Sequence, residues 1–224
     1  MSGLQILKRK NKPSAQQIAL YRDLPVANIS DAMYRLSAGG THLRPYHAGG
    51  YMSGAALTVK CRPGDNLLVH YALNIAEPGD VIVVDAGGDL TNAIVGELML
   101  TYAAKKGVAG VVIHGAIRDS QSIRQNDFPV YAAGITHRGP YKDGPGEVNV
   151  PVSLNGMVIE AGDLVIGDAD GVLCVPYALI DEVYEMASQR HSSEEIKLQN
   201  IKSGKNNRNW VYEKLQALGY ILPE

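Results

Sequence analysis

The chain is poor in cysteine, in tryptophan and in phenylalanine. Its 224 residues include two cysteines, one tryptophan and one phenylalanine. Two thiols cannot supply a disulfide framework for a chain of this length, and no CxxC pair is present for a zinc or redox site. We therefore expect Cys61 and Cys174 to be reduced residues of a core built mainly from aliphatic side chains.

The chain also lacks an excess of charge of either sign. Lys and Arg number 21 and Asp and Glu number 23, which gives a formal net charge of -2. Nucleic-acid phosphates require a basic surface, so this balance argues against a nucleic-acid partner. No apolar run of about 18 residues is present, and the N-terminus lacks the apolar segment of a signal peptide. We expect no membrane association and a cytoplasmic location.

The composition is that of a folded chain, with 46% hydrophobic and 20% charged residues. We expect an N-terminal arm and short helix over residues 1–24, an α/β domain over 25–176 and a helical extension over 177–224. Residues 1–12 are basic and have no hydrophobic pattern, which predicts a flexible arm. The C-terminal extension is the most charged part of the chain and is a candidate to pack on a neighbouring subunit.

Alternating strand and helix patterns predict the α/β class. Val81–Val84 is a continuous β-branched run, typical of a strand buried on both faces in a sheet covered by helices. A glycine loop follows, then a helix expected over 96–106 and a strand over 108–113. This order is the unit of a parallel sheet with a right-handed crossover.

Other segments are assigned from turn and capping residues. The glycine- and proline-rich stretch 137–147 is expected to be a long surface loop of the kind that often carries function. Further strands are expected over 55–61, 148–154 and 164–175, and further helices over 14–23, from 28 or 30 to 39, over 66–76, 176–201 and 210–218.

One corner of the expected sheet gathers groups that carry chemistry. The loop at 115–119 returns to the end of the sheet at which the 96–106 helix begins, so Glu97 should lie near Arg118 and Asp119. Ligands of open α/β sheets bind at this carboxyl edge of the strands. The first amides of the helix, at Leu98 and Met99, are expected to be unpaired and to attract an anion.

The side chains of this corner suit an anionic ligand beside a hard cation. The guanidinium of Arg118 matches a carboxylate, and the carboxylates of Asp119 and Glu97 suit Mg²⁺ or Mn²⁺ better than Zn²⁺. A 2-oxo acid, which can chelate a cation, would satisfy both features. From these residues alone, a plain surface salt bridge at Arg118–Asp119 and a dipole-complementing role for Glu97 stay open.

Several motifs together carry a family resemblance: ISDAM at 29–33, PGDN at 63–66, EPGD at 77–80, GVAGVVI at 107–113, GAIRD at 115–119 and GDADG at 167–171. Over about residues 25–220 the chain resembles the RraA-like family of class II, metal-dependent pyruvate aldolases. The aldolase members carry an acidic residue, twenty further residues and then Arg-Asp, a spacing that Glu97 and Arg118–Asp119 match.

The resemblance implies a fold and an activity. The fold would be a three-layer α/β/α swivelling-domain type with a helical C-terminal extension, assembled as homotrimers or hexamers. The activity would be cleavage of 4-hydroxy-2-oxo acids, of the 4-hydroxy-4-methyl-2-oxoglutarate type, to pyruvate through an enolate, with oxaloacetate decarboxylation beside it. Family members without the signature are non-catalytic regulators that bind ribonuclease E, and this role is the alternative.

The resemblance also implies roles for individual residues. Arg118 would hold the carboxylate and keto oxygens of the substrate. Asp119 would bind Mg²⁺ or Mn²⁺ directly, while Glu97 would hold water on that metal. Glu194, from a neighbouring subunit's C-terminal helix, is a candidate to face the same waters, against the simpler role of a solvated helix residue. The substrate carboxylate would meet the backbone amides of Gly96, Glu97, Leu98 and Met99.

Two further candidates come from the residues themselves. Asn66 and His70 fall on one helical face after a Gly-Asp turn and could form an accessory anion site. The competing interpretation is a capped helix with a structural histidine. His114 adjoins the Arg118–Asp119 loop and could shuttle protons, although strand alternation could equally direct it away from the loop.

Overall fold

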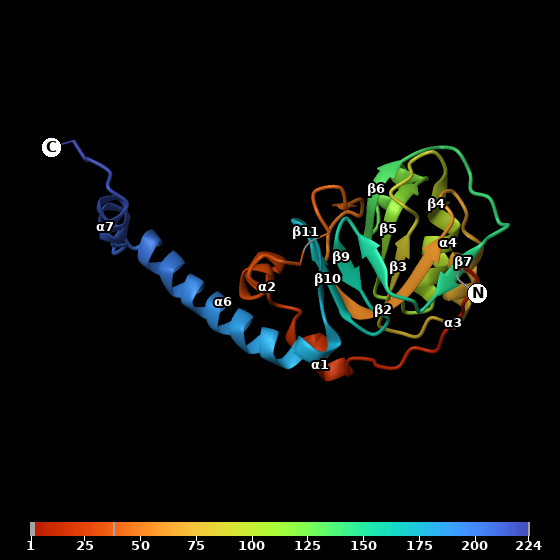
Figure 1. Cartoon of the computed structure of the whole chain (residues 1–224), viewed down its shortest axis with the longest axis horizontal. Coiled ribbons are helices and arrows are strands. Elements are labelled where there is room, and N and C mark those ends of the chain that lie inside the picture. Colours follow the sequence, from red (N-terminus) through yellow and green to blue (C-terminus); the bar gives the residue numbers. More distant parts are fainter. Residues whose placement is uncertain (1–2, 38, 224) are drawn as a thin grey trace.

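The computed structural model describes residues 3–37 and 39–223. Nine strands of this part of the chain form one sheet in the order β1-β6-β5-β3-β2-β10-β11, with β4 beside β5 and β7 beside β2. The sheet curls until it is nearly closed, like a barrel (Figure 1). The strands are β1 (Arg44–Pro45), β2 (Met52–Cys61), β3 (Asp80–Asp85), β4 (Ala93–Val95), β5 (Gly110–Ile117), β6 (Val130–Ile135), β7 (Gly146–Val148), β10 (Leu164–Asp168) and β11 (Gly171–Val175).

The centre of the sheet is parallel and carries the expected β–α–β unit. Strands β2, β3, β5 and β6 pair in parallel, and α4 (Glu97–Lys105) connects β3 and β4 to β5. Strand β3 is buried along its length except at Asp85, which is half-buried. The parallel pairing brings the carboxyl ends of β3, β4 and β5 to one edge of the sheet, where the candidate site lies.

Helices cover the sheet on two sides. On one side, Ile82 and Val84 of β3 belong to the core cluster that includes α3 (Leu67–Ile75) and α4. On another side, α1 (Ala15–Leu20), α2 (Val26–Ala32) and α6 (Ile180–Lys202) cover β10 and β11. The mixed α/β class and the helical C-terminal extension are therefore confirmed.

Inside the curled sheet, strands and not helices meet the second face of β3. Val81 and Val83 belong to a cluster with the two-stranded hairpin β8 (Val152–Leu154) and β9 (Met157–Ile159). The sequence could not distinguish the two kinds of cover, because either one buries a continuous β-branched strand.

Several element boundaries differ from expectation. The second helix ends at Ala32 because Tyr34 and Arg35 adopt left-handed backbone conformations, with φ of 57° and 62°. The segment expected as one strand over 148–154 is divided into β7 and β8. Strands β4 and β6 were not expected, since β4 has three residues and β6 is rich in alanine and glycine.

The N-terminal arm is held against the sheet, so the expectation of a flexible arm is wrong for residues 3–12. The Gly3 amide donates to the Glu147 carboxylate at 2.9 Å, and the Leu7 amide donates to the Val148 carbonyl at 3.0 Å. Arg9 binds the carboxylate of Asp80, which is 1% exposed, at 2.7 Å. The basic residues of the arm thus neutralise a buried acid. No pattern within a short stretch of sequence predicts this pairing.

The C-terminal extension leaves the barrel along α6 and ends with α7 (Asn209–Ala217) (Figure 1). Only the first part of α6 is buried, through Ile180, Val183 and Ala187. Farther along, Ile201 and Trp210 are 55% and 63% exposed. No helix in the described part of the chain combines the length and apolar character needed to cross a bilayer.

Candidate active site

The pairing of β4 with β5 sets Gly96 beside Arg118. Val95 pairs with Ile117, and the Arg118 amide donates to the Val95 carbonyl at 3.0 Å. Gly96 follows Val95 as the N-cap of α4, while Arg118 and Asp119 follow the end of β5. Two segments about twenty residues apart therefore meet at the carboxyl edge of the sheet, as the topology required.

Gly96 is needed for the close approach of these segments. A methyl group at this position would lie 2.3 Å from Asp119 Oδ2 and 2.9 Å from Arg118 Cγ. The backbone of Gly96 is extended, with φ of -147°, so its conformation is open to any residue. The requirement for glycine at residue 96 is therefore one of space, imposed by the side chains of Arg118 and Asp119.

Asp119 occupies a left-handed conformation with φ of 60°, which short polar side chains tolerate. Its Oδ2 accepts a hydrogen bond from the Glu97 amide at 2.9 Å and lies 3.6 Å from Arg118 Nε. Among the described residues, none donates a hydrogen bond to Oδ1. The side chain is 40% exposed, so the second carboxylate oxygen is accessible to a ligand.

The start of α4 offers fewer free amides than expected. The Glu97 amide is bound to Asp119, and the Met99 amide donates to the Gly96 carbonyl at 3.1 Å. The Leu98 amide has no acceptor within residues 3–37 and 39–223. Leu98, and not the pair Leu98 and Met99, therefore supplies the free donor at this helix end.

A cavity of about 430 Å³ lies over this corner, and we call it the main cavity. Its volume falls in the range of small-molecule sites. Of the described residues that line it, three carry basic side chains and none carries a carboxylate. The lining consists of Asn66, His70, Ile94, Val95, Gly96, Leu98, Met99, Arg118, Gly139, Pro140 and Lys142. Such a lining suits an anionic ligand.

Asn66, which lines the main cavity, has a buried side-chain acceptor without a partner among the described residues. The residue is 2% exposed, and its side-chain amide donates to the Ile94 carbonyl at 2.8 Å. Its Oδ1 has no donor among the described residues. Because a buried acceptor without a partner costs about 1–3 kcal/mol, a donor supplied by a ligand would stabilise this arrangement.

Asn66 and His70 therefore belong to the same cavity as Gly96 and Arg118. The sequence suggested a separate accessory site, because nothing local relates the start of α3 to the start of α4. Burial, with a smaller contribution from the nearby Lys142 ammonium, lowers the pKa of His70 below its usual value. His70 is consequently a neutral hydrogen-bonding group at neutral pH.

The stretch 137–147 forms one wall of the main cavity through Gly139, Pro140 and Lys142. Its glycine and proline content predicted a functional loop but did not identify these residues. It is also more regular than expected, since β7 begins at Gly146 and Tyr141 forms a β-bridge with Asp65.

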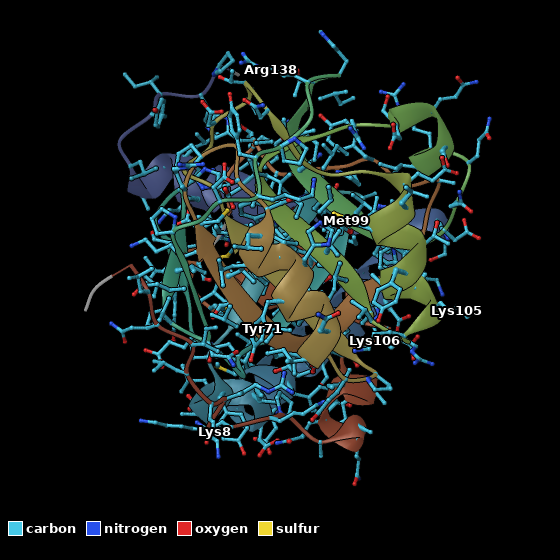
Figure 2. The ribbon with its side chains drawn as sticks, turned by 90° about the vertical axis from the view of Figure 1, so that its right-hand side faces the viewer. Lys8, Tyr71, Met99, Lys105, Lys106 and Arg138 are labelled. Atoms are coloured by element: carbon cyan, nitrogen blue, oxygen red, sulfur yellow. The ribbon has the colours of Figure 1, made fainter. Side chains whose placement is uncertain are left out.

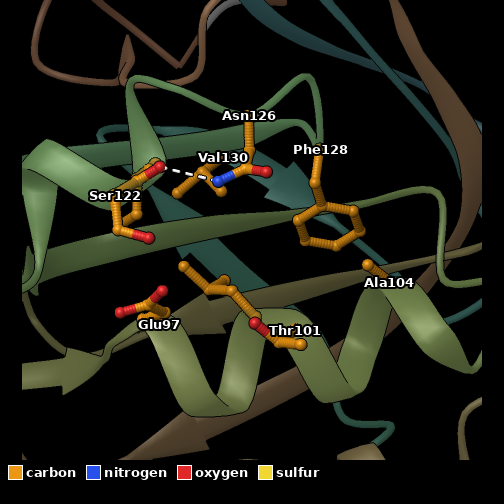
Figure 3. Close-up of a pocket in the computed structure, with 9 residues that line it drawn as sticks. Glu97, Thr101, Ala104, Ser122, Asn126, Phe128 and Val130 are labelled. Carbon is orange, nitrogen blue, oxygen red and sulfur yellow. Dashed lines mark hydrogen bonds between the residues drawn. The ribbon is translucent and has the colours of Figure 1, made fainter.

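The Glu97 carboxylate lines a different hollow of about 170 Å³ between α4 and α5 (Ser120–Ile123). Figure 3 shows Glu97 directed toward Ser122 in this side cavity, where Asn126 donates to the Ser122 carbonyl at 2.7 Å. No basic side chain lines the side cavity among the described residues, so it does not suit a carboxylate. Glu97 meets the Arg118–Asp119 segment through its backbone amide.

Two other candidates lie apart from the main cavity. Glu194 accepts a hydrogen bond from Asn28 at 2.7 Å and lies 3.5 Å from Arg190, so within its own chain it joins α6 to α2. His114 contacts Asp85 at 3.3 Å and is not among the lining residues. The role of Glu194 in a neighbouring subunit's site stays a prediction.

The donor set fits a hydrated hard cation. In the described part of the chain, no three His, Cys, Asp or Glu side chains lie together as a ready metal cage. Asp119 offers one carboxylate oxygen without a hydrogen-bond donor, in an exposed position beside the main cavity. Mg²⁺ is commonly held by one or two carboxylates while it retains several waters. Asp119 therefore fits Mg²⁺ or Mn²⁺ better than a cation that needs a complete protein cage.

The chain is similar to proteins of known sequence and structure. A profile of the RraA-like family, described as Aldolase/RraA, matches residues 26–174. A protein of Halalkalibacterium halodurans named "Putative 4-hydroxy-4-methyl-2-oxoglutarate aldolase" is 39% identical over 180 residues, which cover 80% of this chain and 86% of the relative. The 4-hydroxy-4-methyl-2-oxoglutarate aldolase of Thermus thermophilus is 38% identical over 112 residues, 50% of this chain and 68% of the relative.

A solved structure shares the fold. The structure described as the RNA-processing inhibitor RraA from Thermus thermophilis superposes with a TM-score of 0.63 and 32% identity. The match covers 69% of this chain and 93% of that one. The two named relatives and this structure thus carry two kinds of name, an aldolase and an inhibitor of RNA processing.

Proposed function

The chain belongs to the RraA-like family, and from this premise we propose that it is a divalent-metal-dependent aldolase. It cleaves 4-hydroxy-2-oxo acids of the 4-hydroxy-4-methyl-2-oxoglutarate type to pyruvate and a second oxo compound. One observation carries the proposal: Arg118, Leu98 and Asn66 line one cavity that has no carboxylate in its described lining, and the Leu98 amide and Asn66 Oδ1 have no hydrogen-bond partner among the described residues.

These groups match the needs of the reaction. The Leu98 amide and the Arg118 guanidinium bind the carboxylate of the 2-oxo acid. Water takes the proton of the 4-hydroxyl as C4 becomes a carbonyl carbon, and the electrons of the breaking C3–C4 bond pass to the keto oxygen and produce the enolate of pyruvate. A proton from solvent at C3 then gives pyruvate. Arg118 stabilises the charge that develops on this oxygen, which is the largest contribution in chemistry of this type. Asn66 Oδ1 accepts a hydrogen bond from a hydroxyl of the substrate or from water.

Asp119 would hold the divalent cation, which we propose to be Mg²⁺ or Mn²⁺. When bound, the cation supplies Lewis-acid stabilisation of the enolate oxygen. The hydrogen bond from the Glu97 amide and the nearby Arg118 fix the Asp119 carboxylate in position. The Glu97 carboxylate lines the side cavity, so Glu97 supports this site through its backbone amide, and the water-holding role that the family implies for its side chain is not part of the proposal. Glu194 of a neighbouring copy remains a proposed holder of water at this site, and we propose a homotrimer or hexamer on the same family basis.

Oxaloacetate decarboxylation should accompany aldol cleavage. Loss of CO₂ from oxaloacetate leaves the same pyruvate enolate, so the groups that stabilise one reaction stabilise the other. The same Arg118 requirement should therefore apply to both reactions.

The test is a pyruvate-release assay on 4-hydroxy-4-methyl-2-oxoglutarate and oxaloacetate, with Mg²⁺ and after EDTA treatment. We expect release that depends on Mg²⁺ and is lost in Arg118→Ala, while Arg124→Ala, an arginine outside both cavity linings, keeps it. Release that persists equally after EDTA would exclude the metal-dependent class. Wild-type rates in Arg118→Ala would exclude this cavity.

The alternative is a non-catalytic regulator that binds ribonuclease E. The similarity to a structure named for RNA-processing inhibition supports this candidate. It predicts no pyruvate release from any substrate and a stable complex with ribonuclease E in size-exclusion chromatography. The Glu97 and Arg118–Asp119 spacing favours the enzyme.

A further inference from the structure

We propose that Asn92 is a positioning residue that holds the Gly139 backbone against Arg118 and thereby fixes the direction of the Arg118 guanidinium. Asn92 is 5% exposed and is not among the residues that line the main cavity. It therefore acts on a ligand only through residues that do line the cavity. This inference rests on the proposed function for the ligand that Arg118 binds.

The Arg118 guanidinium is held by few polar contacts of its own. Within the described part of the chain, its one ion pair joins Nε to Asp119 Oδ2 at 3.6 Å, which is longer than a hydrogen bond. The side chain is 43% exposed, and a free arginine side chain has many accessible rotamers. Packing against neighbouring segments must therefore give the guanidinium a defined direction.

Two glycine backbones approach this side chain closely, and both line the main cavity. A methyl group at Gly96 would lie 3.0 Å from Arg118 Nε, and a methyl group at Gly139 would lie 3.3 Å from Arg118 Nη1. Both distances are shorter than ordinary contact, so a side chain on either segment would displace the guanidinium. We call the space bounded by Gly96 and Gly139 the Arg118 slot.

The two walls of the Arg118 slot differ in how they are held. Gly96 is fixed between β4 and α4, whereas Gly139 is exposed and lies in a stretch without regular structure. Asn92 supplies an attachment for this second wall, because its side-chain amide donates to the Gly139 carbonyl. The position of Gly139 beside Arg118 therefore depends on a hydrogen bond from Asn92.

A second hydrogen bond holds the same loop. The Ala93 amide donates to the Arg138 carbonyl at 2.8 Å, so two successive residues of one segment bind two successive carbonyls of the other. Figure 2 shows Arg138 on this loop at the top of the molecule, above Met99 of α4. The bond from Ala93 joins two backbones and does not involve the Asn92 side chain. Loss of the Asn92 donor should therefore release Gly139 without detaching the loop.

The Asn92 side chain is itself fixed by packing. A methyl group at Gly64 would lie 3.1 Å from Asn92 Cβ, which leaves the buried side chain little room to turn. Asn92 directly precedes β4, and Gly96 directly follows it. One short strand thus controls both walls of the Arg118 slot, Gly96 through its own backbone and Gly139 through Asn92.

Asn92→Asp tests the role with almost no change in volume. A carboxylate cannot donate to the Gly139 carbonyl, so we expect the Gly139 backbone to withdraw and the guanidinium to lose its direction. In the pyruvate-release assay kcat/KM should fall about 10-fold, with changes in both kcat and KM, because Arg118 binds the substrate carboxylate and stabilises the enolate. A variant that is only less stable would show a lower Tm with unchanged kcat and KM.

Two further variants separate the hydrogen bond from other effects. Asn92→Ala removes the same donor without adding a charge, and it replaces Asn92→Asp where that variant does not fold. Wild-type kinetics in Asn92→Ala would overturn the proposal. The matched control is Asn155→Asp in the β8–β9 turn, outside the main-cavity lining, where the side chain also donates to a glycine carbonyl, that of Gly39 at 3.1 Å. This control should keep the wild-type kcat/KM.

A double variant tests whether Asn92 acts through Arg118. Arg118→Lys removes Nη1, the atom that lies against Gly139. Adding Asn92→Asp to Arg118→Lys should therefore lower kcat/KM by less than about twofold, because the two changes affect one contact. A further fall of about 10-fold would overturn the positioning role.

Crystal structures separate failure of this inference from failure of the proposed function, since they need neither ligand nor turnover. In the ligand-free wild type we expect an ordered Arg118 guanidinium beside Gly139, and in Asn92→Asp and Asn92→Ala a displaced or disordered one. That result supports the inference even where no pyruvate is released, and in that case the proposed function alone fails. An Arg118 guanidinium in the same place in all three structures would overturn the inference even where pyruvate release is observed.

Discussion

Replacing Gly96 by alanine tests the geometry of the site with a single methyl group. The added carbon would lie 2.3 Å from Asp119 Oδ2, whereas ordinary contact begins near 3.4 Å. The carboxylate must therefore retreat by about 1 Å, and Arg118 must shift with it. Because a misplacement of about 1 Å can cost about 100-fold in rate, we expect kcat/KM for pyruvate release to fall about 100-fold.

The same substitution should leave the fold intact. The Asp119 side chain is 40% exposed and can turn toward solvent, so we expect Tm to fall by no more than about 4 °C. Gly49→Ala is the control, since a methyl group there meets no atom within 4 Å. Pyruvate release and thermal unfolding of the two variants are measured together. A wild-type kcat/KM in Gly96→Ala would show that the site does not need the close approach of Gly96 to Asp119. Global unfolding of that variant would show that Gly96 is needed for folding and not for the site alone.

Three further outcomes are expected. Arg118→Lys should lower kcat about 10²- to 10³-fold in the pyruvate-release assay, because an ammonium does not replace the guanidinium fork at a developing oxyanion; a loss below threefold would contradict this role. Asp119→Asn should raise the Mg²⁺ concentration needed for half-maximal activity at least tenfold, and an unchanged Mg²⁺ titration would remove Asp119 as the ligand. Urea unfolding should show stability that falls with acidification below about pH 4. In the folded protein, the pKa values of Asp65 and Asp85 lie below the usual 3.8. The ionised carboxylates therefore stabilise the folded state at any pH above the pKa that these groups have in the unfolded chain. This stabilisation is lost as the pH falls through the lower pKa values of the folded state. Asp65→Asn should flatten that dependence, and an unchanged slope would contradict it.

The sequence predicted the part of the site that depends on regular structure. The buried run of β3, the length of α4 and the strand that returns after it were enough to place Glu97 near Arg118 and Asp119. In a parallel sheet the carboxyl ends of neighbouring strands lie at the same edge. The order of strands and helices in the sequence was therefore sufficient to predict that these residues are neighbours in space.

The remaining features depend on contacts between segments without periodicity. Lys142 lines the main cavity, and the buried Asp65 carboxylate binds the amide of the next residue, Asp143; neither Lys142 nor Asp65 stands out in a hydrophobic pattern. The Glu97 side chain points into the side cavity because it lies on the face of α4 that borders this cavity, and the sequence does not reveal which face that is. Charged and polar residues that bind distant backbone amides have no signature within a short window of sequence.

The position of Trp210 makes its intrinsic fluorescence a measure of whether the C-terminal extension is covered by another copy. It is the chain's single tryptophan and lies on α7, 63% exposed and outside the linings of both cavities. Its fluorescence emission maximum should therefore not change when a ligand binds in the main cavity. It should shift to shorter wavelength when another copy covers the extension. Dilution followed by fluorescence can thus measure self-association without a label and without interference from substrate.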